Sequence, residues 1–190
     1  IDAKRGYFRV SNDGKAVPIK VHSKVDTLTG KKIYIPEMVF FRLRAGQNFN
    51  DKEVRYEGGR NGIGIKLASI FSKESRVTVR SNGLCFQQTY KNNMRARSEP
   101  KISRDTGPMG TSVEFHVDLS LFKVNGVPLK EIPKDVVCMM HRRVQDLVCP
   151  GVKVTVNGVR SVPCSYFSCA PLFSTEKKNW SVSLYLQGSK

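Results

Sequence analysis

The sequence has few of the residues that build metal sites, disulfide frameworks or membrane spans. Its 190 residues include 5 cysteines and 3 histidines, and no two cysteines have the Cys-x-x-Cys spacing of a zinc site. An odd number of cysteines without a signal peptide indicates a reducing compartment. No apolar run approaches the roughly 20 residues of a membrane-spanning helix. We therefore expect neither a metal site nor a membrane anchor.

Acidic residues are also scarce. The chain has 16 acidic and 32 basic residues, which gives a formal net charge of +16. Such an excess favours a polyanionic partner, most simply nucleic acid. Basic residues are dense at Arg95, Arg97, Lys101 and Arg104. The usual structure of such a run is a solvated loop.

The distribution of turn residues and apolar residues predicts an α/β chain with one core and little more. Asn82-Gly83 predicts a tight hairpin turn, and Pro36 and Pro133 are typical of helix starts. The chain opens on a strand-like segment without an initiator methionine, so we expect an excised fragment. Strands are expected at 7–11, 76–80, 84–90, 112–117 and 152–156, and helices from 36, at 64–71 and from 133.

One segment combines several glycines with a lysine. Residues 58–67 read Gly-Gly-Arg-Asn-Gly-Ile-Gly-Ile-Lys-Leu, and an apolar, helix-spaced pattern begins at Ile65. Glycines let backbone N–H groups approach a ligand, and the start of a helix favours an anion. Lys66 would add a positive charge. The segment therefore predicts a polyphosphate cradle, although a flexible surface loop is the simpler alternative. Neither the Walker nor the Rossmann pattern fits it.

A second segment supports nucleotide binding. The strand-like residues 7–10 lead into Asn12-Asp13-Gly14. A carboxylate beside a glycine after a strand can accept a hydrogen bond from the exocyclic amine of a purine. Asn-Asp-Gly is also an ordinary turn signal. Taken together, the two segments favour adenine at Asp13 and phosphates at 59–66.

The order of these motifs resembles eukaryotic type II DNA topoisomerases. Residues 58–67 resemble the family's Gly-Gly-Arg-Asn-Gly-Tyr-Gly-Ala-Lys-Leu, and residues 12–18 resemble its Asn-Asp-Gly-Arg-Gly-Ile-Pro. Residues 33–38, 110–115 and 142–146 match in the same order. The resemblance is clear over about residues 2–160. It implies the Bergerat (GHKL) ATPase fold, an α+β two-layer sandwich whose mixed, mostly antiparallel sheet carries helices on one face. It also implies an ATP-binding domain at 1–162, with a linker and the start of a transducer domain at 163–190.

The resemblance implies a set of ATP-binding residues. Asp13 would read adenine, and Thr111 would support the adenine site. Other family contacts map to the segment 46–48 and to the phosphate loop. The full set is Asp13, Gly46, Gln47, Asn48, Gly59, Arg60, Asn61, Gly62, Ile63, Gly64, Ile65, Lys66 and Thr111.

Several positions depart from the family pattern. Ala16 replaces a glycine, Phe41 stands where a glycine is usual, and Gly46 and Gln47 stand where two serines are frequent. The methyl group of Ala16 narrows the backbone options, and hydroxyl contacts to ribose or phosphate are missing at 46 and 47. Ile63 and Ile65 replace Tyr and Ala, and are expected to alter the pocket wall.

The family function is ATP-driven passage of one DNA duplex through another, by a homodimer that uses Mg²⁺ and acts in the nucleus or in an organellar DNA compartment. Its general-base glutamate and its DNA-cleaving tyrosine have no counterpart in this chain, so we assign no catalytic residue and expect the fragment alone to be inactive. Glu37, Glu53 and Glu57 are expected to be surface or helix-end charges. The alternatives are a basic, non-enzymatic nucleic-acid module or another GHKL ATPase of the chaperone or mismatch-repair type.

Overall fold

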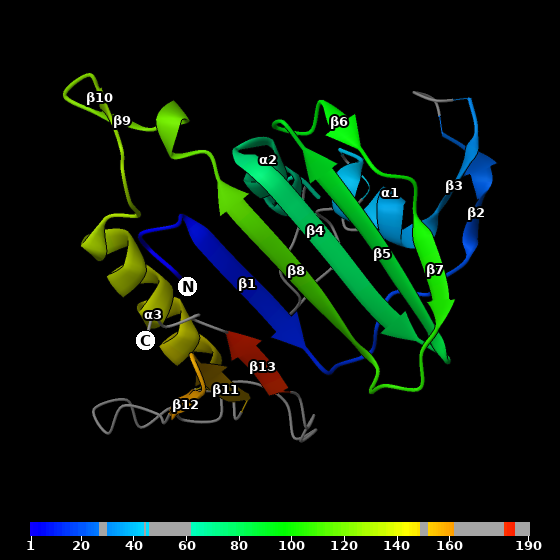
Figure 1. Cartoon of the computed structure of the whole chain (residues 1–190). Helices are drawn as coiled ribbons and strands as arrows, with labels where there is room; N and C mark the ends of the chain where they lie inside the picture. The colour runs from blue at the N-terminus through cyan, green and yellow to red at the C-terminus, as the bar shows by residue number, and fades with distance from the viewer. Residues whose placement is uncertain (27–29, 44, 46–61, 149–151, 162–180, 185–190) are drawn as a thin grey trace, which may run out of the picture.

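The computed structural model describes residues 1–26, 30–43, 45, 62–148, 152–161 and, for the backbone alone, 181–184. Within these ranges one mixed sheet of nine strands forms the centre of the molecule (Figure 1). No helix among them is long and apolar enough to span a bilayer.

Four long antiparallel strands form the middle of the sheet. They are β1 (Tyr7–Asn12), β8 (Gly110–Val117), β4 (Ser72–Ser81) and β5 (Leu84–Lys91), in this spatial order. Val77 pairs with Val113 of β8 on one side and with Gln88 of β5 on the other. Two short strands, β6 (Ala96–Arg97) and β7 (Lys101–Arg104), both pair with β5 at the edge. The predicted α/β fold class with a mostly antiparallel sheet is confirmed.

The other side of the sheet continues from β1 through β13 (Ser181–Leu184) to β11 (Lys153–Val156) and β12 (Val159–Ser161). β13 is antiparallel to β1 and parallel to β11. These four residues therefore belong to the same sheet as the N-terminal strand. The expected domain division at 162 falls just outside the described residues and stays a prediction.

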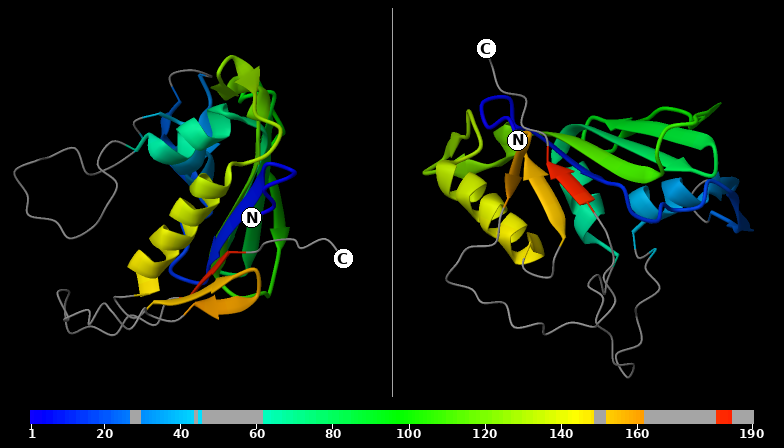
Figure 2. Two further views of the ribbon diagram at one scale, coloured as in Figure 1. Left: turned by 90° about the vertical axis from the view of Figure 1, so that its left-hand side faces the viewer. Right: turned by 90° about the horizontal axis from the view of Figure 1, so that it is seen from below.

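Three helices lie on one face of the sheet, as the side view in Figure 2 shows. They are α1 (Ile35–Phe41), α2 (Gly64–Ile70) and α3 (Lys134–Val148). Pro36 lies in the first turn of α1, where its missing N–H leaves no helical hydrogen bond unmade. Smaller elements complete the described part: the pair β2 (Val21–Val25) and β3 (Lys32–Tyr34), the 3₁₀ turn η1 (Leu119–Leu121), and the hairpin of β9 (Lys123–Val124) and β10 (Val127–Pro128).

The core forms between this face and the first two helices. Alternate residues of a strand point to opposite faces, so Phe8 and Phe115 share the helix side and their rings stack with centroids 4.8 Å apart. Val79 and Phe86 are completely buried in the same cluster. The opposite face is mostly polar. A second, smaller cluster joins α3 to β11 through residues such as Val144 and Val154.

The predicted hairpin turn between β4 and β5 is confirmed. Asn82 and Gly83 both have positive φ, 51° and 74°, which a two-residue turn of the I′ type requires. In contrast, the expectation of a loop around Arg95–Arg104 is wrong, because residues 96–97 and 101–104 pair with β5, although these residues are exposed to solvent as expected. The backbone groups at the edge of β5 can form hydrogen bonds with a neighbouring segment, and basic side chains in that segment do not prevent this pairing.

Candidate nucleotide-binding site

The position of Asp13 depends on a close approach between two strands. Asp13 follows the last residue of β1, and Asn12 pairs with Thr111 of β8. Beside this pair, a Cβ atom on Gly110 would overlap the carbonyl oxygen of Asn12 and lie 3.3 Å from Cα of Asp13. Only glycine fits at residue 110 without a backbone shift. Gly110 therefore fixes Asp13 against the start of β8.

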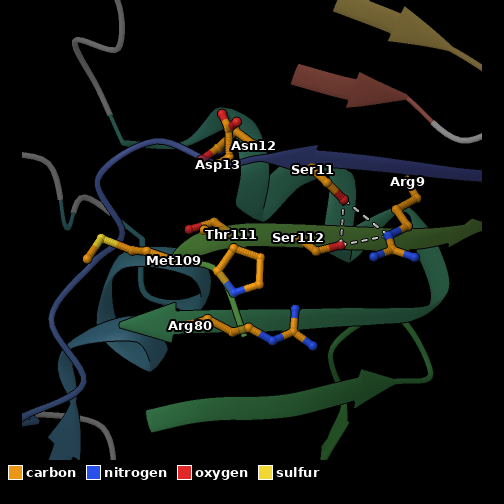
Figure 3. Close-up of a pocket in the computed structure, with 10 residues that line it drawn as sticks. Arg9, Ser11, Asn12, Asp13, Arg80, Met109, Thr111 and Ser112 are labelled. Atoms are coloured by element: carbon orange, nitrogen blue, oxygen red, sulfur yellow. Dashed lines mark hydrogen bonds between the residues drawn. The ribbon is translucent and has the colours of Figure 1, made fainter. Parts of the chain in front are cut away.

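Asp13 and Thr111 line the same cavity, which measures about 250 Å³ (Figure 3). Part of this cavity is built by the polar face of the sheet. There the Arg9 Nε donates hydrogen bonds to the hydroxyls of Ser112 at 2.8 Å and Ser11 at 3.2 Å. The cavity lies at the end of the sheet, its strand side chains Arg9, Ser11, Ser112 and Arg80 belong to the face opposite the helices, and no residue of α1 or α2 lines it. Two of the predicted adenine-site residues are brought together at its rim.

Lys66 on α2 is the most unusual described residue of the predicted phosphate loop. It is only 3% exposed, and burial lowers the pKa of its ammonium group because the charged form loses hydration. No described acidic side chain forms an ion pair with Lys66. Buried lysines are normally paired, so this side chain fits a site that receives an anion.

The backbone around Lys66 follows the glycine pattern. Gly62 has a φ of +58°, and α2 begins two residues later at Gly64. A Cβ on Gly64 would meet nothing within 4 Å, so this backbone is open on that side. The helix has seven residues and no side-chain cap at Ile63. Its short length means that the charge of Lys66 matters more here than the helix dipole.

The chain that follows Asp13 reaches α2 on the helix face of the sheet. Ala16 and Val17, which follow Asp13, pack in the same hydrophobic cluster as Ile65 and Ala68 of α2. This shared cluster places residues 16–17 beside α2, whereas Lys66 is not among the residues that line the cavity of Asp13 and Thr111. Of the other predicted residues, Gly46, Gln47, Asn48, Gly59, Arg60 and Asn61 lie outside the described residues.

Two departures from the family pattern have a clear place in the fold. Ala16 is 6% exposed, so its methyl group fills space in the core. Phe41 stacks on Tyr90 with ring centroids 3.7 Å apart. Both larger side chains contribute to the packing of the helix layer on the sheet.

A buried ionic cluster anchors α1, which precedes the predicted contacts at 46–48. Glu37 is 3% exposed and accepts hydrogen bonds from Arg97, from Arg42 at 3.3 Å and from the hydroxyl of Tyr90 at 3.5 Å. Arg42 also donates to Asp26 at 3.0 Å. Burial and the Glu37 charge raise the pKa of Tyr90 to about 12. Glu37 lies in the first turn of α1, as expected of a helix-end charge, but it is buried and not at the surface. Glu53 and Glu57 lie outside the described residues.

Sequence reasoning missed Gly110 as a positioning residue, although a glycine at the start of a strand was a signal for close backbone approach. Among the described residues no group of three or more His, Cys, Asp or Glu side chains is arranged to hold a metal ion.

Comparisons with known proteins show which family the chain resembles. The chain is 36% identical to DNA topoisomerase 2-beta of Gallus gallus over 93% of its own length and 10% of that protein. It is 41% identical to DNA topoisomerase 2 of Saccharomyces cerevisiae over 77% of its length, again 10% of that protein. This chain is a homologue of eukaryotic type II DNA topoisomerases. No protein-family model matches it.

Solved structures place the likeness to type II topoisomerases in their ATPase region. The ATPase region of the Saccharomyces cerevisiae enzyme, bound to ICRF-187 (dexrazoxane), has a TM-score of 0.67 and 39% identity, and covers 77% of this chain and 37% of that one. The ATPase and transducer domains of the Balamuthia mandrillaris enzyme have a TM-score of 0.73 and 35% identity, over 87% and 42% of the two chains. The chain spans about a tenth of the length of these curated topoisomerase relatives.

Proposed function

We propose that this chain is the nucleotide-binding part of a type II topoisomerase and that it binds ATP between the sheet and α2. The observation that carries the proposal is Lys66, a buried cation without an ion pair among the described residues. A triphosphate would supply the missing negative charge. The homologous ATPase regions support the choice of ATP.

The residues of the chain would share the work of binding. Asp13 accepts a hydrogen bond from the exocyclic amine of adenine, and Thr111 lies beside it on β8. Lys66 and the backbone amides around Gly62 and Gly64 hold the phosphates, where each charge-assisted hydrogen bond contributes about 1.5–3 kcal/mol. The residues at 46–48 and 59–61 complete the proposed contact set.

Mg²⁺ would accompany the triphosphate, where it offsets phosphate charge. The described residues contain no cluster of metal ligands, so they do not fit a magnesium site of their own. We assign no catalytic residue to this chain.

For the whole protein we propose DNA as the substrate, a homodimer as the working form and the nucleus as the location. The net charge of +16 favours a polyanionic partner. ATP binding would close a gate between two subunits, and hydrolysis would reopen it after one duplex has passed through another. These steps need the nine tenths of the relatives' length that this chain does not span.

Ligand-observed NMR with a non-hydrolysable ATP analogue tests the nucleotide site, because it detects weak binding. Replacement of Lys66 by Met should weaken binding by about 10- to 150-fold, as expected for one lost charged hydrogen bond. Asp13→Ala should weaken the binding of adenine nucleotides and leave the binding of inorganic triphosphate unchanged. Lys153→Met, at an exposed lysine of β11, is the matched control. Equal binding by all three variants would overturn the proposal.

A further inference from the structure

A compound groove lies at the end of the sheet where β8 finishes, at the opposite end of that strand from Gly110. Its walls come from the end of β8, η1, the β9–β10 hairpin and the first turns of α3, which Figure 1 shows together beyond the sheet. We call it the hairpin groove. It consists of two adjoining cavities that share Val117, Leu119 and Leu129.

One of the two cavities is apolar. It measures about 180 Å³, and every residue that lines it is hydrophobic, including Phe122, Val136 and Met140. Large apolar side chains continue outside it, since Val124 is 58% exposed and Val127 is 62% exposed. A contiguous apolar surface of this kind is typical of a contact site.

The other cavity is basic. It measures about 390 Å³ and is lined by Lys4, Arg5, Lys73, Lys130 and His116, with no acidic side chain among its lining residues. Asp2 and Asp118 lie behind two of these cations, 3.6 Å from Arg5 and 4.0 Å from Lys73. Among the described residues, Lys4 and Lys130 have no ion pair. The cavity therefore keeps an excess of positive charge.

We propose that the hairpin groove binds an acidic peptide segment that also carries large apolar side chains. Such a segment would insert Leu or Phe side chains beside Leu129 and Met140, and place its carboxylates against Lys4 and Lys130. Charge decides between possible occupants. A second copy of this chain, with a net charge of +16, would bring one basic rim against another. Nucleic acid would satisfy the lysines and leave the apolar cavity exposed to water.

Fluorescence anisotropy of a short labelled peptide, in which Asp and Glu alternate with Leu and Phe, tests the proposal on the 190-residue chain. Two protein variants probe the two cavities: Phe122→Ser for the apolar one and the double replacement Lys4→Glu/Lys130→Glu for the basic one. Each should weaken binding by more than about tenfold. The matched controls are Val159→Ser on β12 and Lys101→Glu/Arg104→Glu on β7, which change exposed residues elsewhere and should leave the affinity unchanged.

Peptide controls separate charge from apolar contact. A peptide with Lys in place of its acids, and one with Ala in place of Leu and Phe, should both fail to bind. Val127→Ser supplies a second apolar variant if circular dichroism shows that Phe122→Ser does not fold. Failure of the acidic peptide to bind, or equal binding by variants and controls, would overturn the proposal. Two further outcomes would overturn the proposal. In one, duplex DNA displaces the peptide and binds the wild type and Phe122→Ser with equal affinity. In the other, the chain self-associates and Phe122→Ser abolishes that self-association.

This proposal is independent of nucleotide binding. The hairpin groove and the Lys66 region share no residue, so the NMR titration with the ATP analogue and the anisotropy measurement can fail separately.

Discussion

Arg97, on the short edge strand β6, donates a hydrogen bond to the carboxylate of Glu37, which lies 60 residues earlier in α1. The two side chains differ in environment, because Glu37 is buried while the Arg97 side chain is 34% exposed. The contact ties the helix layer to the edge of the sheet, immediately before the chain enters the predicted nucleotide contacts at 46–48.

Replacement of Glu37 by Ala should destabilise the chain by about 3–5 kcal/mol, because Arg42 and Arg97 would lose a buried counter-charge. Urea denaturation followed by circular dichroism measures this change. Glu74→Ala is the matched control, since Glu74 forms its ion pairs with Arg76 and Lys91 at the surface and should contribute about 1 kcal/mol or less. Equal losses for the two variants would contradict the buried-cluster interpretation.

Replacement of Gly110 by Ala should destabilise the chain by about 1–3 kcal/mol, since the added methyl group overlaps the backbone at Asn12 and Asp13. It should also weaken adenine nucleotide binding through displacement of Asp13. Gly64→Ala provides the contrast, because its Cβ meets nothing within 4 Å at a helical position. Thermal unfolding should show no loss of stability for Gly64→Ala, and a loss there as large as that for Gly110→Ala would refute the steric argument.

The buried charge of Lys66 should lower the free energy of unfolding at neutral pH, and this loss should disappear at alkaline pH. Its pKa is lowered in the folded chain, so between that pKa and the ordinary value of 10.5 the unfolded chain binds more protons. The free energy of unfolding contributed by Lys66 therefore rises with pH across this window. Lys66→Met should stabilise the nucleotide-free chain by about 1 kcal/mol at pH 7 and remove this rise. Urea titrations from pH 7 to the alkaline range measure both effects, and a destabilised Lys66→Met chain would count against them.

Tyr90 should give the free energy of unfolding the opposite pH dependence, a decrease at alkaline pH. Its pKa is raised from 10.0 to about 12, so the folded chain holds the phenolic proton more tightly than the unfolded chain. The stabilisation is complete below pH 10 and is lost as pH rises through 12. Tyr90→Phe should keep the ring stacked on Phe41 and make the free energy of unfolding less steep above pH 10. Absorbance titration of tyrosinate should show one tyrosine fewer in the highest-pH step, and an unchanged titration would contradict this assignment.

The parts of the fold that could be predicted from sequence depend on neighbouring residues. Asn82-Gly83 specifies its own turn because positive φ is a property of those two residues. Pro36 predicts the start of α1 for the same local reason. The burial of Glu37 could not be predicted, since its main partner, Arg97, comes from a distant strand that basic composition alone assigns to a loop. Long-range pairing, rather than local preference, determines the environments of Glu37 and Arg97.

In the candidate site, too, local features could be predicted from the sequence and long-range contacts could not. Glycine spacing was enough to single out Lys66, because phosphate cradles have a recognisable local pattern. Its burial is a property of how α2 packs on the sheet, and no feature of the residues near Lys66 specifies it. Gly110 fixes Asp13 from a strand nearly a hundred positions away, and this contact appears only when β1 and β8 are paired.

The contact between Gly110 and the end of β1 has a consequence for how the sheet assembles. A slip of β8 by a single position would turn Thr111 and Val113 to the polar side and carry bulkier neighbours into the space that only a hydrogen atom can occupy. Steric exclusion at this one point therefore selects the correct alignment of the two strands during folding.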